Sequence, residues 1–395
     1  MDRIQPYWPP GDTPIPVTGH RIPSRVVDLL IDCIRLRIFP GAVAGCAEPG
    51  RWHWWAAVGW QSLMPVRRPI DRSTVFDLAS LTKPLVTAAR AVWGHLHGEW
   101  DIRAPMVTNF PIFRDVHTVR GHVSLQDVLE HRAGFPAWAP LYLLAVDRRA
   151  RWHWLNTWPM VDPERFLYSC LDYQWLYLTW ERQGVDLVGW LRRWTRRWPR
   201  SAVLTLRPDR RQKFRIAPTE WGRQYERSMA IDFLRAVPAW MSGYPRFQPQ
   251  RAHLRLYRRD WFPDGVVWGV SHDLNAYSLK GFGGNAGAFG TADGVLRAVS
   301  WWFDVLPLLP RRSPPYPGMY RWGWEIGWPG GVSPPDGHEW WHHTGFTGTL
   351  VAVDRCHARI YVLLTHRVHP VVRNVHMNAI RRAWLREAIA VPASR

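Results

Sequence analysis

The stretch that decides the fold of this chain is Asp-Leu-Ala-Ser-Leu-Thr-Lys at residues 77–83. Good helix formers run from Leu81 to Trp93, and Pro84 falls where the first turn of a helix tolerates proline. Residues three apart share a helix face, so the Lys83 amine is expected to reach the Ser80 hydroxyl. If buried near other positive groups, that amine would lose its proton near neutrality and act as a base. A surface N-cap serine beside a solvated lysine is the alternative that this spacing leaves open.

Both ends of the chain contain patterns that predict strands and one amphipathic helix. Apolar residues at helical spacing predict a helix over 26–36, and strands are expected at 42–47 and 54–59. The elements expected near the other end are strands at 340–344, 348–353 and 359–365 and an amphipathic helix between 370 and 388. These patterns predict an α+β fold, with one antiparallel sheet built from both chain ends and the two terminal helices on one face.

The expected division of the chain follows from the same patterns. Residues 1–20 are a proline-rich lead, and 21–85 together with 301–395 form a discontinuous sheet domain. Residues 86–300 form a mainly helical domain inserted between them. Within it, 199–264 is rich in Arg, Pro and Trp without a clear period, so we expect this stretch to be irregular.

Composition limits the classes of protein to consider. With 47% apolar and 21% charged residues among 395, the chain is long and apolar enough to bury a real core. The 28 tryptophans indicate large buried aromatic faces or an aromatic-lined cleft. The net charge is +19, yet only Lys83, Lys213 and Lys280 are lysines. This arginine excess is interpreted either as biased base composition or as attraction to an acidic surface; no specific nucleic-acid partner is indicated.

No targeting, membrane or metal signal stands out. Residues 1–20 lack the apolar run of a secretory signal, and apolar stretches such as 360–364 fall far short of the ~20 residues of a membrane span. The chain is therefore expected to be cytoplasmic, or periplasmic if the true start lies upstream. The four cysteines are scattered without a CxxC pair, which predicts neither a zinc site nor a disulfide framework. We expect no metal and no cofactor.

Six segments of the sequence resemble motifs of one known superfamily, and they occur in the same order as in that superfamily. They are residues 74–83, 123–136, 217–221, 269–276, 284–292 and 343–349, and a similar segment at 362–370 follows them. In this order they resemble the serine β-lactamase and penicillin-binding protein superfamily, in its class C-like branch of esterases and D-aminopeptidases. The resemblance implies the β-lactamase/transpeptidase-like fold and hydrolysis of an ester, small amide or peptide through an acyl-serine intermediate.

The resemblance assigns catalytic roles to three residues. It makes Ser80 the nucleophile, with Lys83 and Tyr168 moving protons between that serine and the leaving group. Tyr168-Ser169-Cys170 occupies the place of the family's Tyr-x-Asn or Tyr-x-Asp triplet. Cys170 departs from the pattern, and because a thiol is a poor hydrogen-bond partner, it is expected to anchor Lys83 less well. A thiol beside that amine is also expected to have a lowered pKa.

The family's Lys-Thr-Gly strand is replaced here by His343-Thr344-Gly345. His343 is expected to donate a hydrogen bond to a substrate oxygen and to be charged part of the time, which disfavours capture of a β-lactam carboxylate. By resemblance, Cys170, Thr344 and Gly345 contact the substrate, with the glycine letting the substrate lie along the strand. The backbone amides of Ser80 and Phe346 would form the oxyanion hole.

Two functions from different classes follow. The first is a serine hydrolase, for which the groups of Ser80, Lys83, Tyr168 and His343 must converge on one cleft. The second is a catalytically weakened, penicillin-binding-protein-like binding module whose arginine- and tryptophan-rich surface holds cell-wall fragments or another acidic partner. Cys170 and the basic excess favour the second function, and the intact motifs favour the first.

Overall fold

The computed structural model describes residues 7–114, 118–145, 147–160, 166–235, 265–309 and 318–391. Its main element is a nine-stranded antiparallel sheet with the order β1-β3-β2-β12-β11-β10-β9-β8, in which β4 pairs with β3. The strands are β1 (Val17–His20), β2 (Gly41–Glu48), β3 (Arg51–Ser62), β4 (Arg68–Pro69), β8 (Tyr320–Arg321), β9 (Trp324–Ile326), β10 (Trp340–Thr344), β11 (Leu350–Asp354) and β12 (Arg359–Thr365).

The middle of this sheet joins the two ends of the chain. β12 pairs with β2, with Leu363 opposite Ala44 and Thr365 opposite Ala42. The expected sheet built from both ends is therefore confirmed. The proline-rich lead also contributes a strand, because β1 adds to the edge of β3 with Val17 opposite Val58. Its four residues are all exposed, so no buried alternation marks them in the sequence.

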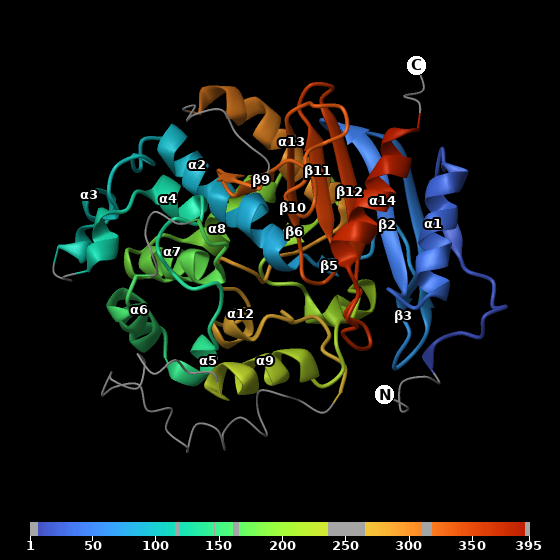
Figure 1. The fold of residues 1–395 in the computed structure, drawn as a ribbon, viewed down its shortest axis with the longest axis horizontal. Coiled ribbons are helices and arrows are strands. Elements are labelled where there is room, and N and C mark those ends of the chain that lie inside the picture. The colour runs from blue at the N-terminus through green and yellow to red at the C-terminus, as the bar shows by residue number, and fades with distance from the viewer. Residues whose placement is uncertain are drawn as a thin grey trace.

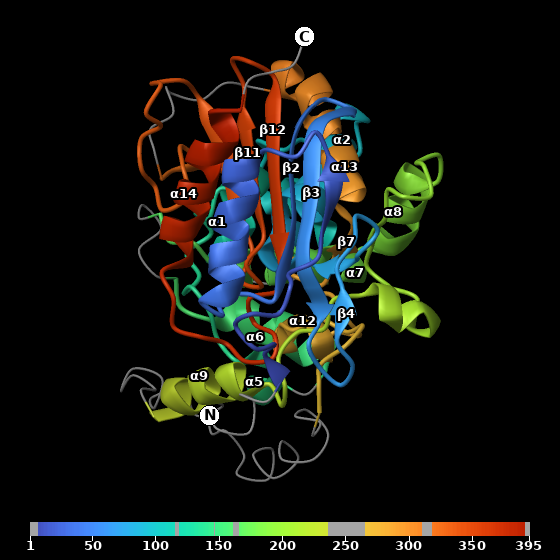
Figure 2. The same ribbon diagram turned by 90° about the vertical axis from the view of Figure 1, so that its right-hand side faces the viewer.

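Two helices cover one face of the sheet, α1 (Ser24–Arg35) and α14 (Met377–Ile389). Figure 2 shows them side by side in front of the strands. Leu30 and Ile34 of α1 share a buried apolar cluster with Trp384 and Leu385 of α14 and with sheet residues such as Leu363. This arrangement confirms the predicted α+β fold with the terminal helices on one face.

The other face of the sheet packs against α13 (Ala292–Val305) and the helix that follows the 77–83 segment. That helix is composite: a 3-10 turn (Ala79–Leu81), a π-helical turn (Lys83–Ala88) and then α2 (Ala89–Leu96). Leu81, Leu85 and Val362 belong to one large buried cluster that continues into the helical region. The segment that carries Ser80 is therefore held between the sheet and the helices by apolar side chains that pack on both.

The helical region lies beside the sheet (Figure 1). Its helices are α3 (Met106–Asn109), α4 (Leu125–Leu129), α5 (Leu141–Leu144), α6 (Arg148–Thr157), α7 (Cys170–Arg182), α8 (Leu187–Thr195), α9 (Gln224–Arg235) and α12 (Leu274–Ser278). All residues from 171 to 180 of α7 are buried, so this helix forms the centre of the region. A second small sheet, ordered β5-β7-β6, is made by Phe76–Asp77, Phe289–Gly290 and Leu204–Thr205.

The expectation that 199–264 is irregular is wrong for its described part. Residues 204–205 form β6, and α9 spans twelve residues, whereas 236–264 lie outside the described residues. Ala230 of α9 packs with Leu143 and Leu274, and the buried Glu226 carboxylate accepts the backbone N–H of Leu274 at 2.8 Å. These tertiary contacts hold a helix whose own apolar pattern is weak.

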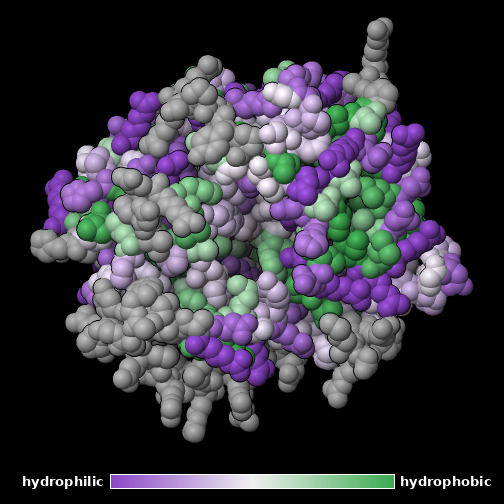
Figure 3. Space-filling model, viewed as in Figure 1, coloured by the Kyte–Doolittle hydropathy of each residue, from purple (hydrophilic) through white to green (hydrophobic). Residues whose placement is uncertain are grey.

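The surface in Figure 3 is hollowed near its centre, between the helical region and the sheet. Within the described part of the chain, no helix has both the length and the apolar character needed to cross a bilayer.

Candidate active site

The loop that carries Ser80 is held in an unusual backbone conformation. Ala79, directly before the serine, has a φ of +47°, a left-handed conformation that costs a non-glycine residue about 1 kcal/mol or more. The buried Asp77 carboxylate stabilises it by accepting the N–H groups of Ala79 at 2.9 Å and His272 at 2.7 Å. Thr82 Oγ1 adds a hydrogen bond to Ala79 O at 2.7 Å. Ser80 is therefore presented from a tight, internally bonded turn.

The turn after β10 lies directly against this loop. A Cβ added to Gly345 would approach Leu78 O to 2.7 Å and would also collide with Thr349 Oγ1. Thr347 Oγ1 donates to Asp77 O at 2.8 Å, which ties the two segments together. Gly345 is thus needed because the Ser80 loop itself, and not only a substrate, approaches the strand end closely. This contact gives the glycine a structural role in addition to the one expected toward a substrate.

The Lys83 amine connects the expected catalytic groups. Lys83 is fully buried, and its Nζ lies 3.0 Å from Ser80 Oγ and 2.8 Å from Tyr168 Oη. Nζ also lies 3.4 Å from the main-chain oxygen of Asn285 and 3.6 Å from Cys170 Sγ. The structure therefore brings together the serine, lysine, tyrosine and cysteine that the sequence analysis selected.

The charge state of Lys83 differs from the expectation. Burial acts to lower the pKa of its amine, but Cys170 and Tyr168 act to raise it, and the net pKa is raised. The expected loss of the proton near neutrality is therefore wrong for the resting site. Burial also raises the pKa of the Tyr168 hydroxyl, and Lys83 offsets this effect only in part. At neutral pH the pair holds an ammonium and a phenol.

Cys170 is the first residue of α7, and its position follows from the helix cap. Ser169 Oγ accepts the N–H of Leu171 at 3.0 Å and donates to Pro136 O at 2.7 Å, which fixes the start of the helix. Burial raises the pKa of the Cys170 thiol despite the nearby Lys83. The expected lowering of this pKa is wrong because desolvation outweighs the attraction of one ammonium.

His343 lies behind Tyr168, with 1% of the residue exposed. The ring centroids of His343 and Tyr168 are 6.1 Å apart, and Nδ1 contacts Thr344 O at 2.9 Å. Burial and the charge of Lys83 hold the pKa of His343 well below its usual range, so the ring is neutral. Because the Nδ1–H donates to Thr344 O, Nε2 carries the lone pair, and it has no hydrogen-bond partner among the described residues. His343 is therefore an acceptor at Nε2, not the partly charged donor that was expected.

Phe346, whose amide is an expected oxyanion donor, is held by neighbours from separate parts of the chain. The His272 ring stacks on its ring at a centroid distance of 5.6 Å, and Arg367 Nε donates to Phe346 O at 2.8 Å. The Arg381 guanidinium of α14 donates to Gly345 O at 2.6 Å and to Thr349 O at 3.0 Å. The turn that carries the amide is thus held by a ring contact to Phe346 and by hydrogen bonds from two arginines to its main-chain oxygens.

Three groups at the site were missed by the sequence analysis. Asn285 acts through its main-chain oxygen, while its side chain donates to Asp273 Oδ2 at 3.0 Å. Asp77 and Arg381 orient the two segments that meet at Ser80. Only the quoted motif blocks at 74–83 and 284–292 gave a signal for Asp77 and Asn285, and nothing in the sequence singled out Arg381.

This fold, with a buried lysine between a serine and a tyrosine, defines the class of serine hydrolases with a β-lactamase/transpeptidase-like fold. A family model described as Beta-lactamase matches residues 31–199 and 205–383. The chain therefore belongs to the Beta-lactamase family.

Relatives and solved structures agree with this assignment. A protein of Salmonella gallinarum named "Putative D-alanyl-D-alanine carboxypeptidase" is 26% identical over 352 residues, which cover 80% of this chain and 74% of that protein. A class C β-lactamase from Rhodobacter sphaeroides has the same fold, with a TM-score of 0.59 and 17% identity over 93% of this chain and 99% of the other. A D-alanine carboxypeptidase from Burkholderia cenocepacia also has this fold, with a TM-score of 0.60 and 15% identity. The match covers 93% of this chain and 98% of that chain.

Proposed function

We propose that this protein hydrolyses an ester, small amide or peptide through an acyl-serine intermediate. The observation that carries the proposal is the position of the Lys83 amine, 3.0 Å from Ser80 Oγ and 2.8 Å from Tyr168 Oη. A lysine in this place links a nucleophile to a second proton carrier, which is the arrangement that acyl transfer requires.

In the proposed reaction, Ser80 Oγ forms a bond to the substrate carbonyl carbon. The step starts from the minor form of the Lys83–Tyr168 pair, in which one of the two groups has already lost a proton to solvent. This form accepts the serine proton and then protonates the leaving oxygen or nitrogen as its bond to the carbon breaks. Water cleaves the new ester in the reverse sense and restores Ser80. The amides of Ser80 and Phe346 would donate to the developing oxyanion, a contribution worth ~3 kcal/mol per donor.

The neutral His343 and the carboxypeptidase relatives bear on the substrate class. A neutral, buried imidazole offers no charge to a substrate carboxylate, which disfavours a dedicated β-lactamase. Its Nε2 atom is covered, so the preference for a peptide or amide is supported by the relatives named as carboxypeptidases. Short peptides and activated esters are therefore the substrates to examine first.

The test is covalent labelling of the whole protein with a fluorophosphonate, followed by intact-mass and peptide mass spectrometry. We expect one adduct on Ser80 in the wild type and none in Ser80→Ala. Turnover of a nitrophenyl ester is expected to fall to background in Ser80→Ala and by orders of magnitude in Lys83→Ala, without additivity in the double variant.

The runner-up function is the weakened binding module, for which the specific observation is Cys170 at the Tyr-x-Asn position. Absence of any Ser80 adduct, together with wild-type ester turnover in Ser80→Ala, would refute the hydrolase. If the turnover shared by the wild type and Ser80→Ala is only the background rate, retention of an anionic cell-wall fragment by the wild type would then favour the binding module.

A further inference from the structure

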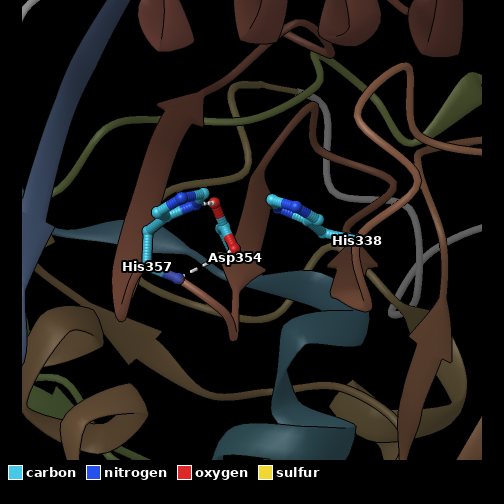
Figure 4. Close-up of side chains that lie close together, drawn as sticks. All are labelled: His338, Asp354 and His357. Carbon is cyan, nitrogen blue, oxygen red and sulfur yellow. Dashed lines mark hydrogen bonds and ion pairs between the residues drawn. The ribbon is translucent and has the colours of Figure 1, made fainter.

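Two histidines and an aspartate meet where β10 begins and β11 ends, at the opposite end of β10 from Thr344. His338 lies just before β10, Asp354 ends β11, and His357 lies in the turn to β12. One ligand atom from each side chain lies within 4.8 Å of those of the other two. Figure 4 shows Asp354 between the two imidazole rings.

The cluster is partly organised without any ion. His357 Nδ1 contacts Asp354 Oδ2 at 2.6 Å, and Asp354 Oδ1 accepts the turn N–H groups of Cys356 and His357. The contact at Nδ1 holds the His357 ring beside the carboxylate. An ion bound by both side chains would replace this contact, because Nδ1 and Nε2 point away from each other across the ring. The aspartate and its turn are thus prepared before a ligand arrives.

His338 contributes the second observation that points to a ligand. Its Nδ1 is buried and has no hydrogen-bond partner among the described residues; Asp336 Oδ2 lies 3.8 Å away. The His338 side chain as a whole is 38% exposed, and Nδ1 forms an ion pair with Asp336 when the ring is protonated, so a ligand can reach this ring from solvent. Its ring lies 5.0 Å from that of His357, centroid to centroid.

The charge around the cluster is also favourable. Arg355, the nearest guanidinium in sequence, pairs with Glu339 at 2.5 Å and not with Asp354. Among the residues that the structure describes, Asp354 makes no ion pair with an arginine, although the chain is strongly basic. Its negative charge is therefore not neutralised by a guanidinium.

We propose that His338, Asp354 and His357 bind a divalent transition-metal ion, with Zn²⁺ the best fit to two imidazoles and one carboxylate. Zn²⁺ bonds of about 2.0–2.2 Å place tetrahedral ligand atoms ~3.3 Å apart, so the separations here must close by about 1.5 Å at most. His357 can supply that movement because its side chain is 60% exposed. Water completes the coordination.

The ion would join three neighbouring strand ends. Trp340 of β10 is paired with Asp354 of β11, and Thr344 at the other end of β10 is paired with Leu350. The four residue steps of β10 between the cluster and Thr344 span about 13 Å, so the ion would lie outside the catalytic site. It would clamp the start of the strand that ends in His343-Thr344-Gly345, and we expect it to stabilise the fold without entering the chemistry.

The experiment measures Zn²⁺ binding to the full chain after chelation, by isothermal titration, with Co²⁺ absorption as a second probe. The wild type should bind one equivalent, and His338→Asn and His357→Asn should weaken binding more than about tenfold. His153→Asn, which alters an exposed histidine on α6, is the matched control and should bind like the wild type. Cys356→Ser should also bind normally.

Thermal unfolding separates binding from folding. The Tm of wild type and of His357→Asn in chelator gives the baseline of each protein, and Zn²⁺ near the wild-type Kd should raise the Tm of the wild type by more than that of the variant. The proposal is overturned if the wild type binds no Zn²⁺ at micromolar concentration, or if His357→Asn binds equally well. It is also overturned if Cys356→Ser alone abolishes binding, since an exposed thiol would then be the ligand.

Discussion

Lys83 is the residue whose surroundings make the most direct prediction about rate. Its pKa is raised, so at neutral pH almost all molecules hold an ammonium that cannot accept the Ser80 proton. The fraction lacking that proton grows about tenfold for each pH unit below the pKa. We therefore expect kcat/KM for an activated ester to rise with a logarithmic slope near +1 between pH 7 and 9. Ser80→Ala supplies the blank for hydroxide hydrolysis, and a flat profile from pH 6 upward would contradict the raised pKa.

The cysteines are predicted to differ in reactivity. Burial raises the pKa of Cys170, and it raises the pKa of Cys33 and Cys46 to about 11, whereas Cys356 is exposed. Because the thiolate is the reactive form, iodoacetamide at pH 7 should label Cys356 alone and leave ester turnover intact. Peptide mass spectrometry locates the label, and Cys356→Ser should remain unlabelled. Loss of activity with a label on Cys170 would show that its thiol is activated.

Cys170→Asn is predicted to keep or increase ester turnover. Cys170 Sγ lies 3.6 Å from Lys83 Nζ, and an amide oxygen of similar size is a much better acceptor for that ammonium. Steady-state kinetics of the two proteins, with circular dichroism to establish equal folding, measure the effect. A large loss of kcat in a folded variant would assign the thiol a positive role in the reaction.

At the scale of elements, the turn after β10 is the part whose position sets the site. Gly345→Ala would force the turn away from Leu78 O, which lies 2.7 Å from the added Cβ, and would displace the Phe346 amide. We expect kcat to fall at least about a hundredfold, as for loss of an oxyanion donor. Gly11→Ala, where no atom lies within 4 Å of the added Cβ, is the control and should leave kcat unchanged. Equal kcat in both variants would show that the turn does not position the oxyanion donor.

The strands illustrate how far the sequence predicts elements. The ranges 340–344 and 359–365 coincide with β10 and β12, because runs of apolar and β-branched or aromatic residues there are bounded by polar turns. The lysine, serine and tyrosine were found because their side chains follow motif spacing. Asn285 acts at Lys83 through a main-chain oxygen, and Arg381 acts through contacts across the fold, so neither leaves a local pattern. β1 was not predicted for a similar reason: its residues carry no strand pattern of their own, and pairing with β3 makes them a strand.

At the scale of the whole molecule, stability is predicted to depend on the packing of both chain ends. Leu385 of α14 is fully buried against the sheet beside Trp384 and the α1 residues. Leu385→Ala should cost about 2–5 kcal/mol of unfolding free energy through lost burial and a cavity. Urea titration followed by tryptophan fluorescence measures it, and Leu308→Ala, at a largely exposed leucine, is the control. A similar midpoint for both variants would contradict the role of the α1–α14 layer.

The pairing of β2 with β12 has a consequence for biosynthesis. Ala44 and Leu363 are neighbours in the sheet, but more than 300 residues of chain separate them. During translation the first three strands emerge early and must wait, with an open edge, for a partner that is made much later. Until β12 leaves the ribosome, β10 and β11 are not joined to β2, so the turn after β10 is not held by the sheet against the Ser80 loop. We therefore expect nascent chains that stop before β12 to depend on chaperones and to react with no fluorophosphonate.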